Sequence, residues 1–106
     1  MQSKIKFANE KVQKAFEKLK REDIKMHEIL SRAFEDIEEN VFCGIQIPKK
    51  LIPKDYVKKF KVKNLWKYNL PDAWRLIYSV EGKNLLIVSI VLEWLDHKTY
   101  ERRFKY

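Results

Sequence analysis

The chain has 106 residues, of which 45% are hydrophobic and 36% are charged, and its formal net charge at pH 7 is +8. This length fits one ordinary domain, and the share of apolar residues excludes disorder as the default state. The longest apolar run, residues 85–91, is interrupted by Ser89 and is too short to cross a membrane.

Two features of the sequence bear on its cellular compartment. The first residues, Met1–Lys6, have no apolar core, so we expect no signal peptide. The single cysteine, Cys43, cannot form an internal disulfide, which fits a reducing cytosol. We therefore expect one cytoplasmic domain that spans residues 1–106.

The net charge is confined to one part of the chain. Residues 1–40 contain nine basic and nine acidic side chains, whereas residues 41–106 contain fourteen basic and six acidic ones. Eight lysines lie between Lys49 and Lys67, against the single acid Asp55. This asymmetry indicates a positive face of the kind that binds a polyanion. The alternative is a solvated surface that is simply rich in lysine.

The first forty residues predict a strand and two helices. Ile5 and Phe7 alternate with lysines, which is typical of a short half-buried strand. Asn9 and Asp23 are suitable N-caps, each placed before a helical apolar stripe. The stripes are Val12, Ala15, Phe16 and Leu19, then Met26, Ile29, Leu30, Ala33, Phe34 and Ile37. The break between them is short, so we expect an antiparallel helical hairpin.

The rest of the chain predicts strands. Pro53 suits the first turn of a short helix that ends at Phe60. Strand-like runs follow at residues 65–69, 74–80 and 85–94, and the last two are joined at residues 81–84, where Gly82 is available for a positive φ. We expect one or two helical turns and an extended end in residues 96–106. The predicted fold class is α+β: an N-terminal strand and a helical hairpin, then a three- to four-stranded antiparallel sheet.

The strand at residues 74–80 carries an arginine among apolar residues. Trp74, Leu76, Tyr78 and Val80 are predicted on one face, and Arg75, Ile77 and Ser79 on the other. An arginine at such a position is costly unless it has a partner or faces an open site. One interpretation is a buried ion pair with Glu93 or Asp72. The other is a guanidinium that binds a phosphate from the floor of a cleft.

The C-terminal tail, residues 95–106, combines groups that metal-independent cleavage of a phosphodiester needs. Such cleavage takes a base for the 2′-hydroxyl, a cation for the phosphorane and an acid for the leaving oxygen. The tail supplies His97, Tyr100 and Tyr106 as candidates, with Arg102 and Arg103 as candidate RNA contacts. Taken singly, His97 also suits a surface or capping role, and Tyr100 suits packing against Phe104.

Other chemistries find little support in the sequence. One cysteine and two histidines 70 positions apart form no recognised metal-ligand cluster, so we expect no metal and no other cofactor. The chain has no glycine-rich phosphate loop and no nucleophile elbow. Cys43 could serve as a nucleophile, but we interpret it as a buried structural thiol, and His27 as a structural residue of the helical hairpin.

Residues 64–78, Gly82 and residues 92–100 together resemble the RelE/ParE superfamily of type II toxins. The shared pattern is a strand with an Arg-Leu-hydrophobic-Tyr core, here Arg75–Tyr78, then a hairpin and a last strand that runs into a His-Lys-x-Tyr segment. The family's order of elements matches the order expected above. The resemblance implies the toxin of a toxin–antitoxin system, a ribosome-dependent mRNA endonuclease whose partners are the ribosome, the mRNA and a cognate antitoxin, with which it forms a hetero-oligomer.

The resemblance also implies roles for particular residues. Arg75 matches the arginine that stabilises the cleaved phosphate, while His97 and Tyr100 match the residues after the last strand. Tyr106 occupies the place of an aromatic acid–base residue. Lys61 and Lys63 lie near the place of basic catalytic residues in some members and are expected to bind RNA. Binding of ribosomal RNA is implied for Lys49, Lys50, Lys54, Lys58 and Lys59.

The same fold also serves other functions, so two alternatives stay open. One is a ParE-like toxin that inhibits DNA gyrase by protein contact without nuclease activity. The other is an inactive relative that only binds RNA.

Overall fold

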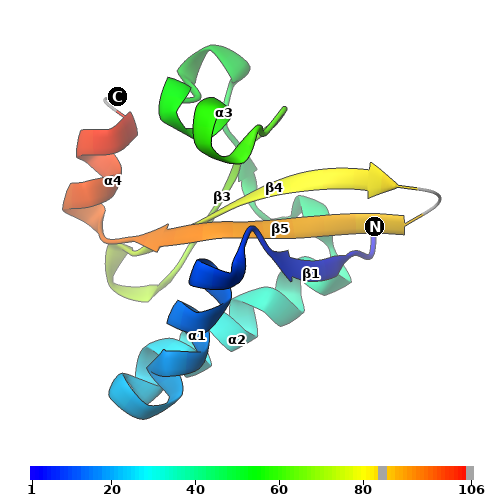
Figure 1. The fold of residues 1–106 in the computed structure, drawn as a ribbon. Helices are drawn as coiled ribbons and strands as arrows, with labels where there is room; N and C mark the ends of the chain where they lie inside the picture. Colours follow the sequence, from blue (N-terminus) through cyan, green and yellow to red (C-terminus); the bar gives the residue numbers. More distant parts are fainter. Residues whose placement is uncertain (84–85, 105–106) are drawn as a thin grey trace.

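The computed structural model describes residues 1–83 and 86–104, with the backbone alone for residues 83 and 86–88. The fold class is α+β, as predicted (Figure 1). The strands are β1 (Lys4–Phe7), β2 (Ile45–Gln46), β3 (Trp66–Asn69), β4 (Arg75–Lys83) and β5 (Leu86–Leu95). The helices are α1 (Glu10–Glu22), α2 (Ile24–Glu39), α3 (Lys54–Phe60) and α4 (His97–Phe104).

The strands form one mixed sheet in the order β1-β5-β4-β3-β2. Strands β2 to β5 are antiparallel neighbours, which confirms the predicted antiparallel sheet of three to four strands. The N-terminal strand joins this sheet as a fifth strand, with Lys4 opposite Val88 and parallel to β5. The expected turn residue Gly82 was wrongly placed: it lies within β4 opposite Ile87, and its φ is not positive. The connection itself, residues 84–85, lies outside the described residues.

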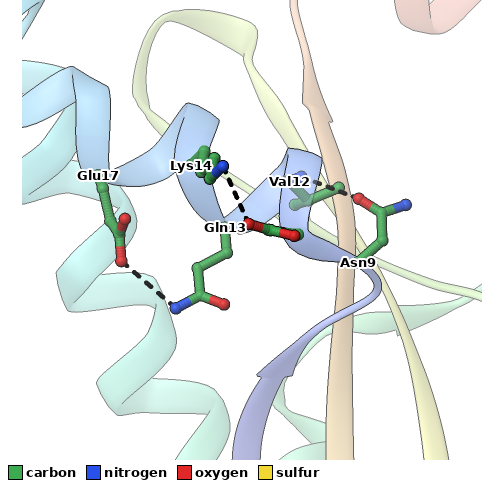
Figure 2. A network of polar contacts seen from close by, with 6 residues as sticks. Asn9, Val12, Gln13, Lys14 and Glu17 are labelled. Carbon is green, nitrogen blue, oxygen red and sulfur yellow. Dashed lines mark hydrogen bonds and ion pairs between the residues drawn. The ribbon is translucent and has the colours of Figure 1, made fainter.

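The helical hairpin covers one face of the sheet. Asn9 caps α1 by accepting a hydrogen bond from the Val12 amide at 2.9 Å, as Figure 2 shows, and Asp23 caps α2 in the same way at the Met26 amide. The apolar stripe of α2 is buried against Leu76, Tyr78 and Val91 of the sheet. These contacts confirm the predicted caps and the predicted core face of the second helix.

The opposite face of the sheet is covered by α3 and α4, which stand above the strands in Figure 1. Their buried residues Tyr56, Tyr100 and Phe104 pack with Ile77 and Leu92 in a second apolar cluster. Strand β4 is therefore covered on both faces. Arg75, Ile77 and Ser79 all face α3 and α4, as the alternation predicted.

The longest helix of the described residues, α2, has 16 residues, and none of the helices has both the length and the apolar character needed to cross a bilayer.

The connection between β3 and β4 contains backbone strain. Asp72 and Ala73 have φ values of 58° and 63°, and the Trp74 amide donates to the Pro71 carbonyl at 3.4 Å. Two consecutive positive φ angles are those of a type I′ turn, in which glycine is preferred at the second central position. The Cβ of an alanine in this region costs about 1 kcal/mol.

We therefore expect Ala73→Gly to raise the free energy of unfolding by about 0.5–1 kcal/mol, because relief of the strain exceeds the added entropy of the unfolded chain. Urea denaturation followed by circular dichroism would measure the change. Ala15→Gly, at an exposed position in α1, is the matched control and should lower stability by about 1 kcal/mol. A loss of stability in Ala73→Gly would contradict the strain argument.

Gly44 directly precedes β2 and packs closely against β3 and β4. A Cβ added there would lie 2.7 Å from the Lys67 carbonyl oxygen and closer still to the Tyr78 hydroxyl. That hydroxyl is fixed because it is buried and donates to the Val41 carbonyl at 2.9 Å.

We expect Gly44→Ala to lower the free energy of unfolding by about 1–3 kcal/mol through overpacking. The double variant Gly44→Ala with Tyr78→Phe should recover part of this loss, since it removes the nearest atom. Equal stability of Gly44→Ala and the original chain in a thermal melt would show that β2 shifts freely.

Candidate functional site

Arg75 lies at the start of β4, on the sheet face that carries α3 and α4. Its side chain is half-buried, and Nη1 donates to the Trp74 carbonyl at 3.1 Å. The Nε atom is buried without a hydrogen-bond partner. No carboxylate of the described residues forms an ion pair with Arg75. The two partners suggested by the sequence are thus not used, since Glu93 binds Arg103 and no ion pair joins Arg75 to Asp72.

The ring of Tyr100 brings two cations together. The Arg75 Cζ lies 5.6 Å from the ring centroid and the Lys67 Nζ lies 5.2 Å from it. The strand register explains this arrangement, because Lys67 is opposite Ile77 and both share a sheet face with Arg75. Such cation–π contacts contribute about 0.5–2 kcal/mol each and partly offset the cost of gathering like charges.

The pKa of Lys67 is lowered from its ordinary value. Burial is the larger cause, and the positive charge of Arg75 adds to it. Both effects disfavour the protonated amine. A lysine with a lowered pKa beside a fixed guanidinium can give or take a proton near a negatively charged ligand, which an ordinary surface lysine does poorly.

The other predicted catalytic residues that the structure describes, Tyr100 and His97, differ in their surroundings. Tyr100 is only 3% exposed, and its ring packs on Phe104 with 4.6 Å between centroids. Its ring lies next to the Arg75 guanidinium and the Lys67 ammonium group, in a position that orients the two cations. His97 is exposed at the start of α4, and its described contact is with the Glu101 carboxylate at 3.0 Å. Tyr106 lies outside the described residues. The expectation that the Cys43 thiol is buried was wrong, because Cys43 lies in the turn before β2 and is exposed.

The lysines predicted to bind RNA are all exposed. They lie on the turn after β2, on α3 and on the loop that follows, namely Lys49, Lys50, Lys54, Lys58, Lys59, Lys61 and Lys63. Arg102 is also exposed. Arg103, by contrast, is engaged by Glu93, since its Nη1 lies 2.7 Å from both carboxylate oxygens.

A second group of polar side chains lies beside the Arg103–Glu93 ion pair. The pKa of Tyr56 is raised, mainly by burial and further by the Glu93 carboxylate, so the phenol stays protonated. Its ring packs 5.5 Å from that of Phe104, which connects it through Tyr100 to the cation pair.

Within the described residues, no three His, Cys, Asp or Glu side chains are grouped as a metal site would require. No protein-family model, curated protein or solved structure matches the chain. The chemistry of the site must therefore be argued from its own residues.

Two residues of this face were missed by the sequence analysis. Lys67 was counted only as one of eight lysines, because its closeness to Arg75 depends on the β3–β4 register. The alternation of Lys67 with Trp66 and Tyr68 was the available signal, since it assigns Lys67 to the opposite face from the aromatic side chains. Tyr56 gave no signal, because its burial depends on α3 packing against α4.

We expect Arg75→Gln to raise the pKa of Lys67 toward its ordinary value, because the nearby positive charge is removed. The recovery should be partial, since burial is the larger cause of the lowering. Titration of the lysine side-chain ¹³C resonances by NMR would measure it. Arg32→Gln, an exposed site on α2, should leave Lys67 unmoved, and an unchanged Lys67 in Arg75→Gln would refute the coupling.

Proposed function

We propose that this protein is a metal-independent endoribonuclease that acts as the toxin of a type II toxin–antitoxin system. The observation that carries the proposal is the pairing of Arg75 and Lys67 over Tyr100, beside a lysine-rich surface and without a carboxylate partner for Arg75 among the described residues. The topology and the resemblance to RelE-like toxins add support. The +8 net charge favours a polyanionic substrate.

The proposed reaction is an internal transfer at phosphorus. The 2′-hydroxyl loses its proton and attacks the adjacent phosphorus, the bond from phosphorus to the 5′-oxygen breaks, and that oxygen takes up a proton. The products are a 2′,3′-cyclic phosphate and a 5′-hydroxyl end. Arg75 would stabilise the charge that develops on the phosphoryl oxygens, and Lys67 would transfer one of the two protons.

The exposed lysines would hold the backbone of mRNA and ribosomal RNA next to this site. A chain of this size offers little surface to align a free RNA, so the ribosome is proposed to position the substrate. The proposed partner in the resting cell is an antitoxin with an acidic or amphipathic segment that covers the basic face, in a hetero-oligomer within the cytoplasm.

The test is induced expression in cells, with growth and primer extension on a reporter mRNA as readouts. We expect growth arrest and cuts confined to translated regions for the original chain. Arg75→Ala should lower the cleavage rate by about 10²–10³-fold, because a preorganised charge contact is lost. Lys25→Gln, an exposed lysine of α2, should cleave as the original chain does.

Other outcomes would point to the alternatives. Arrest with intact mRNA and altered DNA supercoiling would assign the protein to the gyrase inhibitors. Intact mRNA without arrest, together with RNA binding by the purified protein, would identify a binding module. Circular dichroism of each variant separates loss of function from loss of fold.

A further inference from the structure

A cleft lies next to α3, beside the Arg103–Glu93 ion pair. Its volume is about 490 Å³, which is in the range of small-molecule sites. The lining combines aromatic rings with charged groups: Tyr56, Phe60, Lys58, Lys59, Glu93 and Arg103, with Asp55 at its edge. Two smaller hollows of about 280 and 270 Å³ adjoin it and share Lys59 and Phe60 with it.

One side chain of the cleft indicates that a ligand binds there. Tyr56 is only 2% exposed, and its hydroxyl, although close enough to Glu93 and Arg103 for their charges to act on its pKa, forms no well-aligned hydrogen bond with either. A buried hydroxyl without a partner costs about 1–3 kcal/mol, so it persists where a bound group can meet it. The Ser79 Oγ is a second buried atom without a hydrogen-bond partner, and Ser79 lines the adjoining hollow of about 280 Å³. The Ser79 residue as a whole is also only 2% exposed.

The charges of the cleft favour an anion. Glu93 is neutralised by Arg103 at 2.7 Å, and Lys58 and Lys59 outnumber the remaining acid, Asp55. Lys59 Nζ lies 5.3 Å from the centroid of the Phe60 ring, so a cation and a flat apolar ring are adjacent. A phosphate beside an aromatic surface is the pattern with which single-stranded nucleic acids are bound.

We propose that this cleft binds one nucleotide, with its phosphate at Lys58 and Lys59 and with its base or sugar in reach of the Tyr56 hydroxyl and the Phe60 ring. The use of this cleft as a subsite for the RNA that Arg75 cleaves rests on the proposed function. The binding of a free nucleotide in the cleft does not depend on the proposed function. The rings of Tyr56, Phe104 and Tyr100 form a continuous packed row between the two places, with centroids 5.5 and 4.6 Å apart.

The test is an NMR titration of the full chain with adenosine 5′-monophosphate, and with inorganic phosphate as a second probe. We expect shifts at α3 and around Glu93, and weaker binding of phosphate than of the nucleotide. Tyr56→Phe should weaken nucleotide binding about threefold to tenfold, the range of one hydrogen bond. Its melting temperature should stay equal or rise, because the variant removes an unpartnered buried hydroxyl. A merely structural role of the hydroxyl would lower the melting temperature instead.

Matched variants separate the contributions. Lys59→Gln should weaken nucleotide binding, whereas Lys25→Gln, which removes the same charge from α2, should not. Unchanged affinity in Tyr56→Phe would overturn the proposal, as would equal binding of phosphate and nucleotide, or shifts centred on Arg75.

The two proposals can fail separately. If Arg75→Gln binds the nucleotide normally while the original chain cleaves no RNA, the nucleotide site stands and the nuclease function falls. If RNA is cleaved but Tyr56→Phe binds and cleaves as the original chain does, the nuclease stands and the nucleotide site falls.

Discussion

Strand β4 is covered on both faces, and this constraint organises the rest of the molecule. Leu76 and Tyr78 are buried beneath the helical hairpin, while Ile77 and Ser79 are buried beneath α3 and α4. Strict alternation then assigns Arg75 to the side of α3 and α4. A one-residue slip would put the arginine under the hairpin and Leu76 against the ion pairs, so the register of this strand is strongly fixed. The position of the charge follows from the packing of its apolar neighbours.

The ion pair of Arg103 with Glu93 determines what Arg75 can do. Glu93 lies on the same sheet face as Arg75, two pairs along the β4–β5 ladder, and is one of the two partners that the sequence suggested for the arginine. Arg103 of α4 engages both oxygens of Glu93, and among the described residues Arg75 contacts the Trp74 carbonyl and the Tyr100 ring instead of a carboxylate. Helix α4 thus does two things: it supplies the ring that supports the guanidinium, and it removes the acid that would neutralise it.

The sequence allowed prediction of what is determined locally. Asn9 and Asp23 identify the helix starts because a cap is formed within three residues. The two faces of β4 follow from period-two alternation. By contrast, the parallel pairing of β1 with β5 joins residues more than 80 positions apart, and no local pattern encodes it. The prediction for Gly82 failed because β4 continues beyond its apolar run to Lys83 and so includes the glycine.

The same distinction applies to the candidate site. Arg75 could be selected from the sequence because a charged residue in an apolar strand is costly wherever it packs. Lys67 could not, because only the antiparallel register makes one of many lysines a neighbour of that arginine. Tyr56 depends on still more distant information, the docking of α3 against the last helix of the chain.

Three buried polar atoms of the described residues have no hydrogen-bond partner: Tyr56 Oη, Arg75 Nε and Ser79 Oγ. All three lie on the sheet face that carries α3 and α4. A domain of this size is stable by only about 5–15 kcal/mol, and each such atom costs about 1–3 kcal/mol. On the hairpin face, by contrast, the Tyr78 hydroxyl donates to Val41 and the Ser89 hydroxyl pairs with Ser3. One face therefore satisfies its buried polar groups internally and the other does not. Polar groups held ready at a cost to stability are typical of a surface that binds a ligand, and here they coincide with the basic side chains.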